Sequence, residues 1–131
     1  MEFETALSSK ERVAELHELS AAALQELGGA LKTAETLLRR AYRPYKVIFC
    51  KLGFSRGCSC HFHVAPITQS LLEKISAHPG YANEPDGNDA MLFLSRVYCE
   101  KALTDAERAA MTSTVQSLRA IFSERPDDRA G

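Results

Sequence analysis

The run Cys58–Pro66 reads CSCHFHVAP and places two histidines, His61 and His63, in a stretch whose composition predicts a buried strand. Because successive side chains of a strand point to opposite faces, both imidazoles share one face with Ser59. The opposite face would carry Cys58, Cys60, Phe62 and Val64. An imidazole fixed in one orientation can act as a nucleophile or as a general acid. The run therefore predicts a histidine site on one face of a strand and core packing on the other.

Two further interpretations of the histidines stay open from the sequence. Both could be structural residues held by hydrogen bonds, or both could ligate a metal with a third group from elsewhere. A zinc site built from Cys58, Cys60, His61 and His63 together is disfavoured, because alternation sends the sulfurs away from the imidazoles. We predict no metal and no cofactor, and we expect Cys50, Cys58 and Cys60 to be small, buried apolar residues.

Length, composition and charge limit the classes of protein to consider. The 131 residues are 45% hydrophobic and 25% charged, which predicts one globular domain over 1–123 and a flexible, charged tail over 124–131. A formal net charge of -1 gives no electrostatic footprint for a nucleic-acid polymer or an anionic membrane. No apolar run is long enough for a bilayer, and the acidic start Met1–Glu4 does not resemble a signal peptide. We expect a cytoplasmic protein with reduced cysteines.

The segment before the histidines is predicted to be mostly helical. Apolar residues recur at helical spacing from about 10 to 42, and Ser8–Glu11 resembles a capping box at the start of this stripe. Gly28 and Gly29 interrupt the stripe and suggest a kink or a close helix contact, while Ser20 offers an alternative start for a second helix. The helix should end near Tyr42.

The histidine strand is predicted to form the second half of an antiparallel hairpin over about 46–66. Three helices should follow: one capped by Thr68, a buried one over about 91–98 after a loop at 81–89, and one capped by Thr104. The predicted fold class is α+β, with a long N-terminal helix packed on a small antiparallel sheet and three C-terminal helices. His17 and His78 are expected to face solvent.

Three segments in this order resemble the histidine-triad (HIT) superfamily of nucleotide hydrolases and transferases. They are Arg43–Val47 (RPYKV), Lys51–Gly53 (KLG) and His61–Pro66 (HFHVAP), and the resemblance covers about residues 20–67. In that family a helix ends in a proline-containing turn, a strand runs into a Leu-Gly turn, and a return strand carries His-x-His-x-His, two apolar residues and proline. The later part of the chain looks like a divergent bacterial branch of the family.

The resemblance implies roles for the residues of the return strand. The proline of the family lies three residues after the last triad histidine, so Pro66 makes His63 the last member, His61 the middle member and Ser59 the first. The middle histidine of the family attacks an α-phosphate and forms a covalent nucleotidyl-histidine. By this resemblance His61 is the nucleophile, and His63 holds the phosphate or protonates the leaving group. An alternative register makes His63 the nucleophile and Ala65 the last member.

The resemblance also implies a substrate and a partner. The substrate would be a nucleotide or dinucleotide, and the protein is expected to be a homodimer. The loop over 53–57 would contact phosphate through backbone N–H groups and through Ser55, Arg56 and Gly57, although an ordinary hairpin turn explains these residues equally well.

The chain departs from the family pattern in two ways. Serine replaces the first histidine at position 59, and the strands that usually precede the long helix are not evident. Either the chain is shortened at its N-terminus or a partner subunit completes the pocket. The alternative function is a non-catalytic, degenerate HIT-like module that acts through dimerisation or nucleotide binding.

Overall fold

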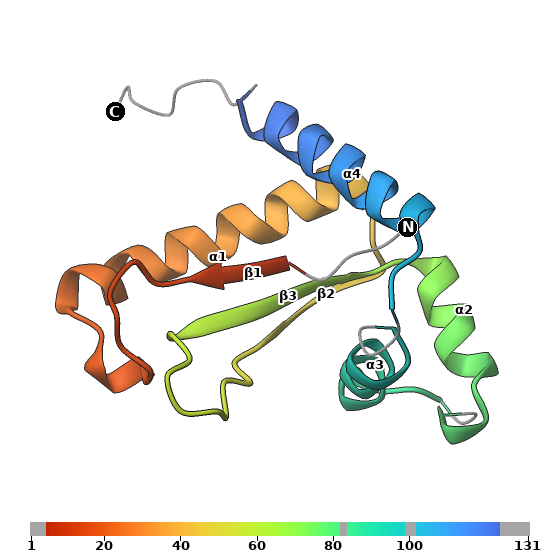
Figure 1. Ribbon diagram of the computed structural model, residues 1–131, viewed down its shortest axis with the longest axis horizontal. Helices are drawn as coiled ribbons and strands as arrows, with labels where there is room; N and C mark the ends of the chain where they lie inside the picture. The colour runs from red at the N-terminus through yellow and green to blue at the C-terminus, as the bar shows by residue number, and fades with distance from the viewer. Residues whose placement is uncertain (1–4, 82–83, 99–101, 124–131) are drawn as a thin grey trace.

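The computed structural model describes residues 5–81, 84–98 and 102–123 of the chain. It confirms the predicted α+β class: a three-stranded antiparallel sheet carries one long helix, and three helices follow (Figure 1). The strand order is β1-β3-β2, so the strand with the histidines lies in the middle. The main elements are β1 (Thr5–Ser8), α1 (Ala21–Tyr42), β2 (Lys46–Cys50), β3 (His61–Ile67), α2 (Gln69–Ala77), α3 (Gly87–Phe93) and α4 (Asp105–Ser123).

The two faces of β3 are buried against different helices. Val64 packs with Val47 of β2 and Leu38 of α1 in one hydrophobic cluster. Ala65 and Ile67 point to the opposite face, where they join a second cluster with side chains of α2 and α3. Each aliphatic side chain buried in this way stabilises the fold by roughly 1.5–3 kcal/mol. The side chains of the histidine strand therefore alternate between two hydrophobic clusters, as the sequence predicted.

A short strand precedes the long helix, although no strand was evident there in the sequence. Strand β1 pairs antiparallel with β3, with Ser8 opposite His61 and Ala6 opposite His63. Four residues are too few for alternation to be visible in the sequence, and the strand is stabilised by its pairing with a distant partner. The pairing makes β3 a central strand with hydrogen-bonded neighbours on both sides.

Helix α1 begins at Ala21, so the prediction of helix from residue 10 was wrong and the alternative start at Ser20 was right. The Ser20 hydroxyl accepts a hydrogen bond from the backbone N–H of Ala23 and caps the helix. Glu11 does not complete a capping box with Ser8, because its carboxylate accepts hydrogen bonds from the N–H and hydroxyl of Ser20.

The two glycines in the middle of α1 do not break the helix, which continues to Tyr42. Gly28 and Gly29 lie within one continuous helix and are exposed, and apart from their chain neighbours and the helix's own backbone no described atom lies within 4 Å of the Cβ that either would carry. Another helix does not approach these glycines closely in the described part of the structure, and they do not interrupt the helix. Arg43 ends the helix in a left-handed conformation, with φ 46°, directly before Pro44.

The predicted starts of α2 and α4 are confirmed, but the start of α3 is not. Thr68 caps α2, and Thr104 forms a capping box with Glu107 at the start of α4. Helix α3 begins at Gly87, within the predicted loop, because Asp86 and Asp89 form a reciprocal capping box. A π-helical turn over Leu94–Tyr98 continues it.

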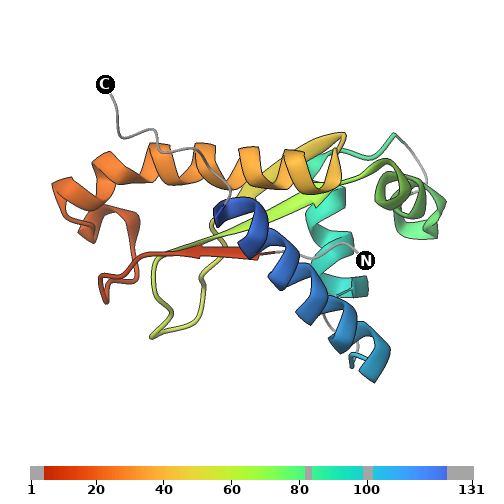
Figure 2. The ribbon, with the colours of Figure 1, turned by 90° about the horizontal axis from the view of Figure 1, so that it is seen from above.

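Helix α4 is attached to the rest of the molecule mainly near its end. Its last turn lies beside α1, where Ile121 and Phe122 are next to Thr33, Leu37 and Arg40, and its first turns diverge from α1 (Figure 2). None of its residues is buried. The predicted flexible tail over 124–131 lies outside the described residues.

No helix in the described part of the chain combines the length and the apolar character that crossing a membrane requires.

Candidate functional site

His61 and His63 lie side by side on β3, and each presents its Nε2 atom to the other. The Nε2–Nε2 distance is 3.0 Å, which is a hydrogen bond, and the two ring centroids are 4.8 Å apart in an edge-to-face arrangement. Because only one proton lies between two nitrogens in such a bond, one ring donates and the other accepts. The sequence prediction that both imidazoles share one face of the strand is confirmed.

The backbone carbonyl of Ser59 determines which histidine accepts. His61 Nδ1 lies 2.7 Å from this carbonyl oxygen, which can only accept, so Nδ1 carries the proton. In the neutral ring, Nε2 of His61 then has a lone pair and accepts the hydrogen bond that His63 Nε2–H donates. The arrangement supplies a nucleophilic nitrogen and, 3.0 Å away, an N–H donor.

The histidines occupy the less covered part of their sheet face. Ala65 and Ile67 follow on the same face of β3 and are buried against α2 and α3. His61 and His63 lie before these residues and are half-buried. A small group can approach the imidazoles at the open end of the strand, while the covered end holds the strand in place.

The loop between β2 and β3 brings one predicted phosphate-binding segment beside His61. A Cβ at Gly53 would lie 3.6 Å from His61 Cε1, so the backbone passes close to the ring. Ser55, Arg56 and Gly57 are exposed. The backbone N–H of Cys58 bonds to Ser55 O at 3.3 Å, and Gly57 has φ +85°, which is the geometry of a hairpin turn that requires glycine.

Sequence reasoning missed two neighbours of the histidines, Ser8 and Cys50. Ser8 of β1 lies opposite His61, and Cys50 of β2 lies opposite His63, so both side chains lie on the histidine face. Ser8 Oγ lies 3.1 Å from Ser59 Oγ. The sequence held no signal for Ser8, because β1 was not recognisable, whereas the hairpin register would have placed Cys50 once the turn length was known.

The cysteines within the described residues are free thiols. Cys60 is buried as predicted, with 3% of its surface exposed, but the same prediction was wrong for Cys50 and Cys58, which are half-buried. Among the residues that the structure describes, no group of three or more His, Cys, Asp or Glu side chains could hold a metal ion.

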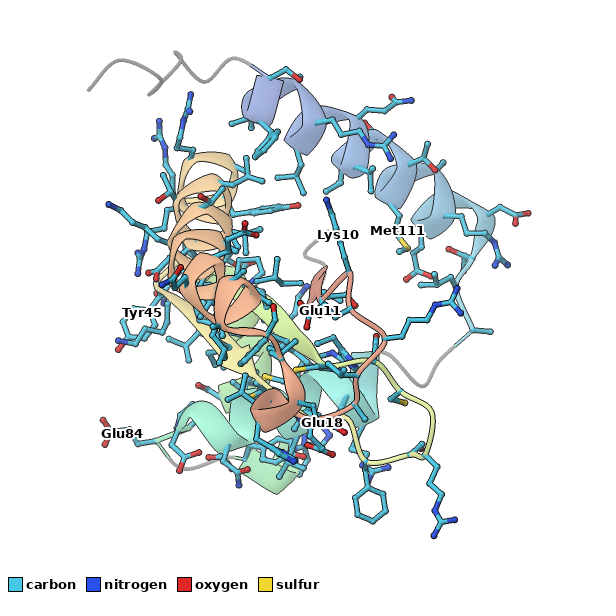
Figure 3. All side chains as sticks on the ribbon, turned by 90° about the vertical axis from the view of Figure 1, so that its left-hand side faces the viewer. Lys10, Glu11, Glu18, Tyr45, Glu84 and Met111 are labelled. Carbon is cyan, nitrogen blue, oxygen red and sulfur yellow. The ribbon has the colours of Figure 1, made fainter. Side chains whose placement is uncertain are left out.

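A pocket of about 380 Å³ lies on the other side of the sheet, beneath the first half of α1. Its apolar lining includes Leu7 and Phe62, which lie on the sheet face opposite the histidines, and Leu27 of α1. Lys10 also lines it and projects from the segment between β1 and α1 toward the side where Met111 of α4 lies (Figure 3). The histidine pair and this pocket are therefore separated by the sheet.

The polar rim of this pocket includes Glu11, whose carboxylate is held at the start of α1. Hydrogen bonds from the hydroxyl and the N–H of Ser20 lower the pKa of Glu11 below its ordinary value. Nearby, Lys51 Nζ lies 3.0 Å from Glu15 Oε2, and this hydrogen bond raises the pKa of Lys51. These contacts fasten the segment before α1 both to that helix and to the end of β2.

The two remaining histidines do not contribute to the site. His17 is exposed, as expected. His78 was expected to face solvent but is half-buried, because its ring stacks on Tyr81 with centroids 5.1 Å apart and meets Phe93 edge-on. Its Nδ1 accepts the backbone N–H of Gly80.

Comparison with known proteins gave no match to a family model, to a curated protein or to a solved structure.

Proposed function

We propose that the protein is a HIT-like nucleotide hydrolase or nucleotidyl transferase that acts at an α-phosphate through a covalent nucleotidyl-His61. The observation that carries this proposal is the pair of contacts made by His61: Nδ1 to Ser59 O at 2.7 Å and Nε2 to His63 Nε2 at 3.0 Å. One nitrogen is fixed as a donor, so the other keeps the lone pair that a nucleophile needs.

The first chemical step forms the adduct. His61 Nε2 bonds to the α-phosphorus as the bond from phosphorus to the leaving group breaks. The leaving group departs with that electron pair and takes the Nε2 proton of His63, which acts here as an imidazolium and becomes a neutral imidazole; its Nε2 is 3.0 Å from the attacking nitrogen. Positive charge develops on the His61 ring, and the Ser59 carbonyl that accepts from Nδ1–H stabilises it. Entry of the phosphoryl group between the two rings replaces their mutual hydrogen bond.

The second step resolves the adduct. Water attacks the phosphorus and gives a proton to His63, the phosphorus–nitrogen bond breaks, and its electron pair returns to His61 Nε2. A different acceptor in place of water would make the reaction a transfer. The free thiols and the absence of any metal or cofactor from the proposed steps fit a cytoplasmic enzyme that uses only its own side chains.

The burial of the strand favours His61 over His63 as the nucleophile. Under the alternative register the third position would be Ala65, which is 1% exposed beneath α2 and α3. A site centred on His63 would therefore extend toward the covered part of the sheet. With His61 in the middle, the three positions are 59, 61 and 63, at the open end.

The decisive experiment is adduct trapping with adenylylated substrates. We would incubate wild type, His61→Ala and His17→Ala with adenosine 5′-phosphoramidate and with dinucleoside polyphosphates, then measure nucleotide release and an acid-labile adduct by intact mass. Wild type and the exposed-histidine control His17→Ala should form the adduct, and His61→Ala should not. Equal behaviour of wild type and His61→Ala would rule out His61 as the nucleophile.

A second candidate function is a non-catalytic module that acts through a homodimer. The observation in its favour is apolar surface on the two long helices: Leu24 of α1 is 43% exposed, and Val115 and Phe122 of α4 are 44% and 53% exposed. Exposed apolar side chains that gather on helix surfaces are typical of an interaction surface.

Sedimentation velocity over a range of protein concentrations tests the dimer directly. Wild type should sediment as a dimer, and the double substitution L24D/V115D should sediment as a monomer while its circular dichroism stays unchanged. A wild-type protein that remains monomeric at the highest concentration would eliminate this candidate. The matched control is Thr112→Asp, which adds a charge at another exposed position of α4.

A further inference from the structure

One peptide unit beside the histidines is held from both sides. The carbonyl of Ser59 accepts the hydrogen bond from His61 Nδ1 at 2.7 Å, and the N–H of Cys60, in the same planar unit, donates to Val13 O at 2.7 Å. Because the unit is planar, its N–H and C=O point in opposite directions, and fixing one fixes the other. Val13, in the segment before α1, therefore helps to orient the carbonyl that accepts the hydrogen bond from His61.

A side-chain contact joins the same place to β1. Ser8 Oγ lies 3.1 Å from Ser59 Oγ and 3.4 Å from Ser9 O, to which it donates. With the Ser8 proton on Ser9 O, the Ser59 hydroxyl supplies the proton of the Ser8–Ser59 bond. The backbone N–H of Ser9 also donates to Cys60 O at 3.0 Å. Residues of β1 and of the segment after it therefore make hydrogen bonds to Ser59 and Cys60, the two residues whose shared peptide orients His61.

The hydroxyl contact matters because it is the only side-chain hydrogen bond that supports the Ser59–Cys60 peptide from β1 in the described part of the chain. Strand β3 starts only at His61, and Ser59 is an exposed residue at the end of the loop that leaves β2 at Cys50. Among the described residues, the Ser59 side chain has no other hydrogen bond besides the one to Ser8. A rotation of the Ser59–Cys60 peptide would withdraw the acceptor from His61 Nδ1.

We propose that Ser8 is a positioning residue for His61: through Ser59 it holds the carbonyl that keeps the proton on Nδ1 and the lone pair on Nε2. This inference deepens the proposed function, because it assigns a supporting hydroxyl from β1 to the site that has serine where the family has its first histidine. The tautomer of His61 is a property of the ligand-free protein, so it can be measured whether or not the protein is an enzyme.

The test is the His61 tautomer, read from long-range ¹H–¹⁵N correlation spectra of protein labelled with ¹⁵N-histidine. Wild type should show the Nδ1–H form. Ser8→Ala should raise the fraction of the Nε2–H form relative to the Nδ1–H form by about fivefold, the equivalent of one ordinary hydrogen bond. Ser8→Thr, which keeps the hydroxyl, should restore the wild-type ratio.

Two further variants separate positioning from a general loss of structure. Ser59→Ala removes the other hydroxyl without touching β1 and should shift the ratio as far as Ser8→Ala, and the double variant should shift it no further. Ser76→Ala, an exposed serine on α2, should leave it unchanged. Wild-type tautomer ratios in both folded alanine variants would overturn the proposal and leave the Val13 contact as the sole orienting interaction.

The same variants distinguish this proposal from the proposed function. If His61 forms the adduct, Ser8→Ala should slow adduct formation in proportion to the fall in the fraction of His61 that is in the Nδ1–H form. A tautomer shift without any adduct in wild type would keep Ser8 as a positioning residue and reject the nucleotidyl-histidine. An adduct in wild type with no tautomer shift in the variants would support the nucleotidyl-histidine and reject Ser8 as a positioning residue.

Discussion

The Ser20 hydroxyl donates to the carboxylate of Glu11, nine residues earlier, while it accepts from the N–H of Ala23 in the first turn of α1. One hydroxyl thus caps the helix and ties it to the segment that follows β1. The charge on Glu11 is favoured by this arrangement, and the positive end of the helix macrodipole lies beside it. This contact has a consequence for stability as a function of pH.

Stability should fall in acid as Glu11 becomes protonated. Its folded-state pKa lies below the ordinary value of 4.5, so its contribution is present above that value and is lost as the pH falls through the folded pKa. Urea unfolding midpoints between about pH 3 and 6 should drop less steeply for Glu11→Gln than for wild type. Glu26→Gln, which alters another carboxylate at the same pocket, is the control and should follow the wild-type curve.

Replacing His63 should affect substrates according to their leaving groups. In the proposed mechanism His63 Nε2–H protonates the departing group, so His63→Asn should lower turnover of substrates with poor leaving groups by about 10²–10⁴-fold. A nucleotide ester of nitrophenol, whose leaving group needs no proton, should lose less than about tenfold. Steady-state kinetics on both substrates make the comparison, and equal losses would assign His63 a binding role instead.

The turn at Gly57 should tolerate alanine poorly. Its φ of +85° is strained for any residue with a Cβ, so Gly57→Ala should lower the free energy of unfolding by roughly 1–2 kcal/mol. Gly29→Ala is the matched control, because it lies in a helix with open space around it, and it should raise stability by about 0.5–1 kcal/mol. Chemical denaturation of the two variants measures both effects, and a neutral Gly57→Ala would show that the turn relaxes.

The two halves of α1 should differ in their sensitivity to truncation. Leu38, which is 2% exposed, packs with Val47 and Val64 under the second half, so Leu38→Ala should cost about 2–5 kcal/mol. Leu24 in the first half is exposed, and Leu24→Ala should change the unfolding free energy by less than about 0.5 kcal/mol. A large loss in Leu24→Ala at concentrations where the protein is dimeric would instead place Leu24 in the interface.

Features with a short-range cause were predictable from the sequence. The faces of β3 follow from its alternation, and the caps at Ser20, Thr68 and Thr104 follow from hydroxyls at a fixed offset from the helix start. The hairpin register then brings both histidines to one face of the middle strand. These parts of the fold and site need no knowledge of distant contacts.

Features that depend on distant contacts were not predictable. Strand β1 is recognised only through its pairing with β3, and the orientation of the Ser59 carbonyl only through Val13 and His61. The half-buried position of His78 depends on Phe93, which lies on another helix. Helix α3 was placed too late because its capping box uses aspartate at both positions, a variant of the usual serine or threonine with glutamate.

Successive residues of strand β3 face two different environments, one on each side of the sheet. Odd-numbered residues from His61 onward face the imidazole site and the cluster of α2 and α3, while Phe62 and Val64 face the pocket and the core beneath α1. A one-residue insertion in the loop over 51–60 that shifted the strand register would exchange these surfaces and bury the imidazoles under α1. The loop can therefore vary in sequence more freely than in length, because its length determines which side of the sheet carries the histidine pair.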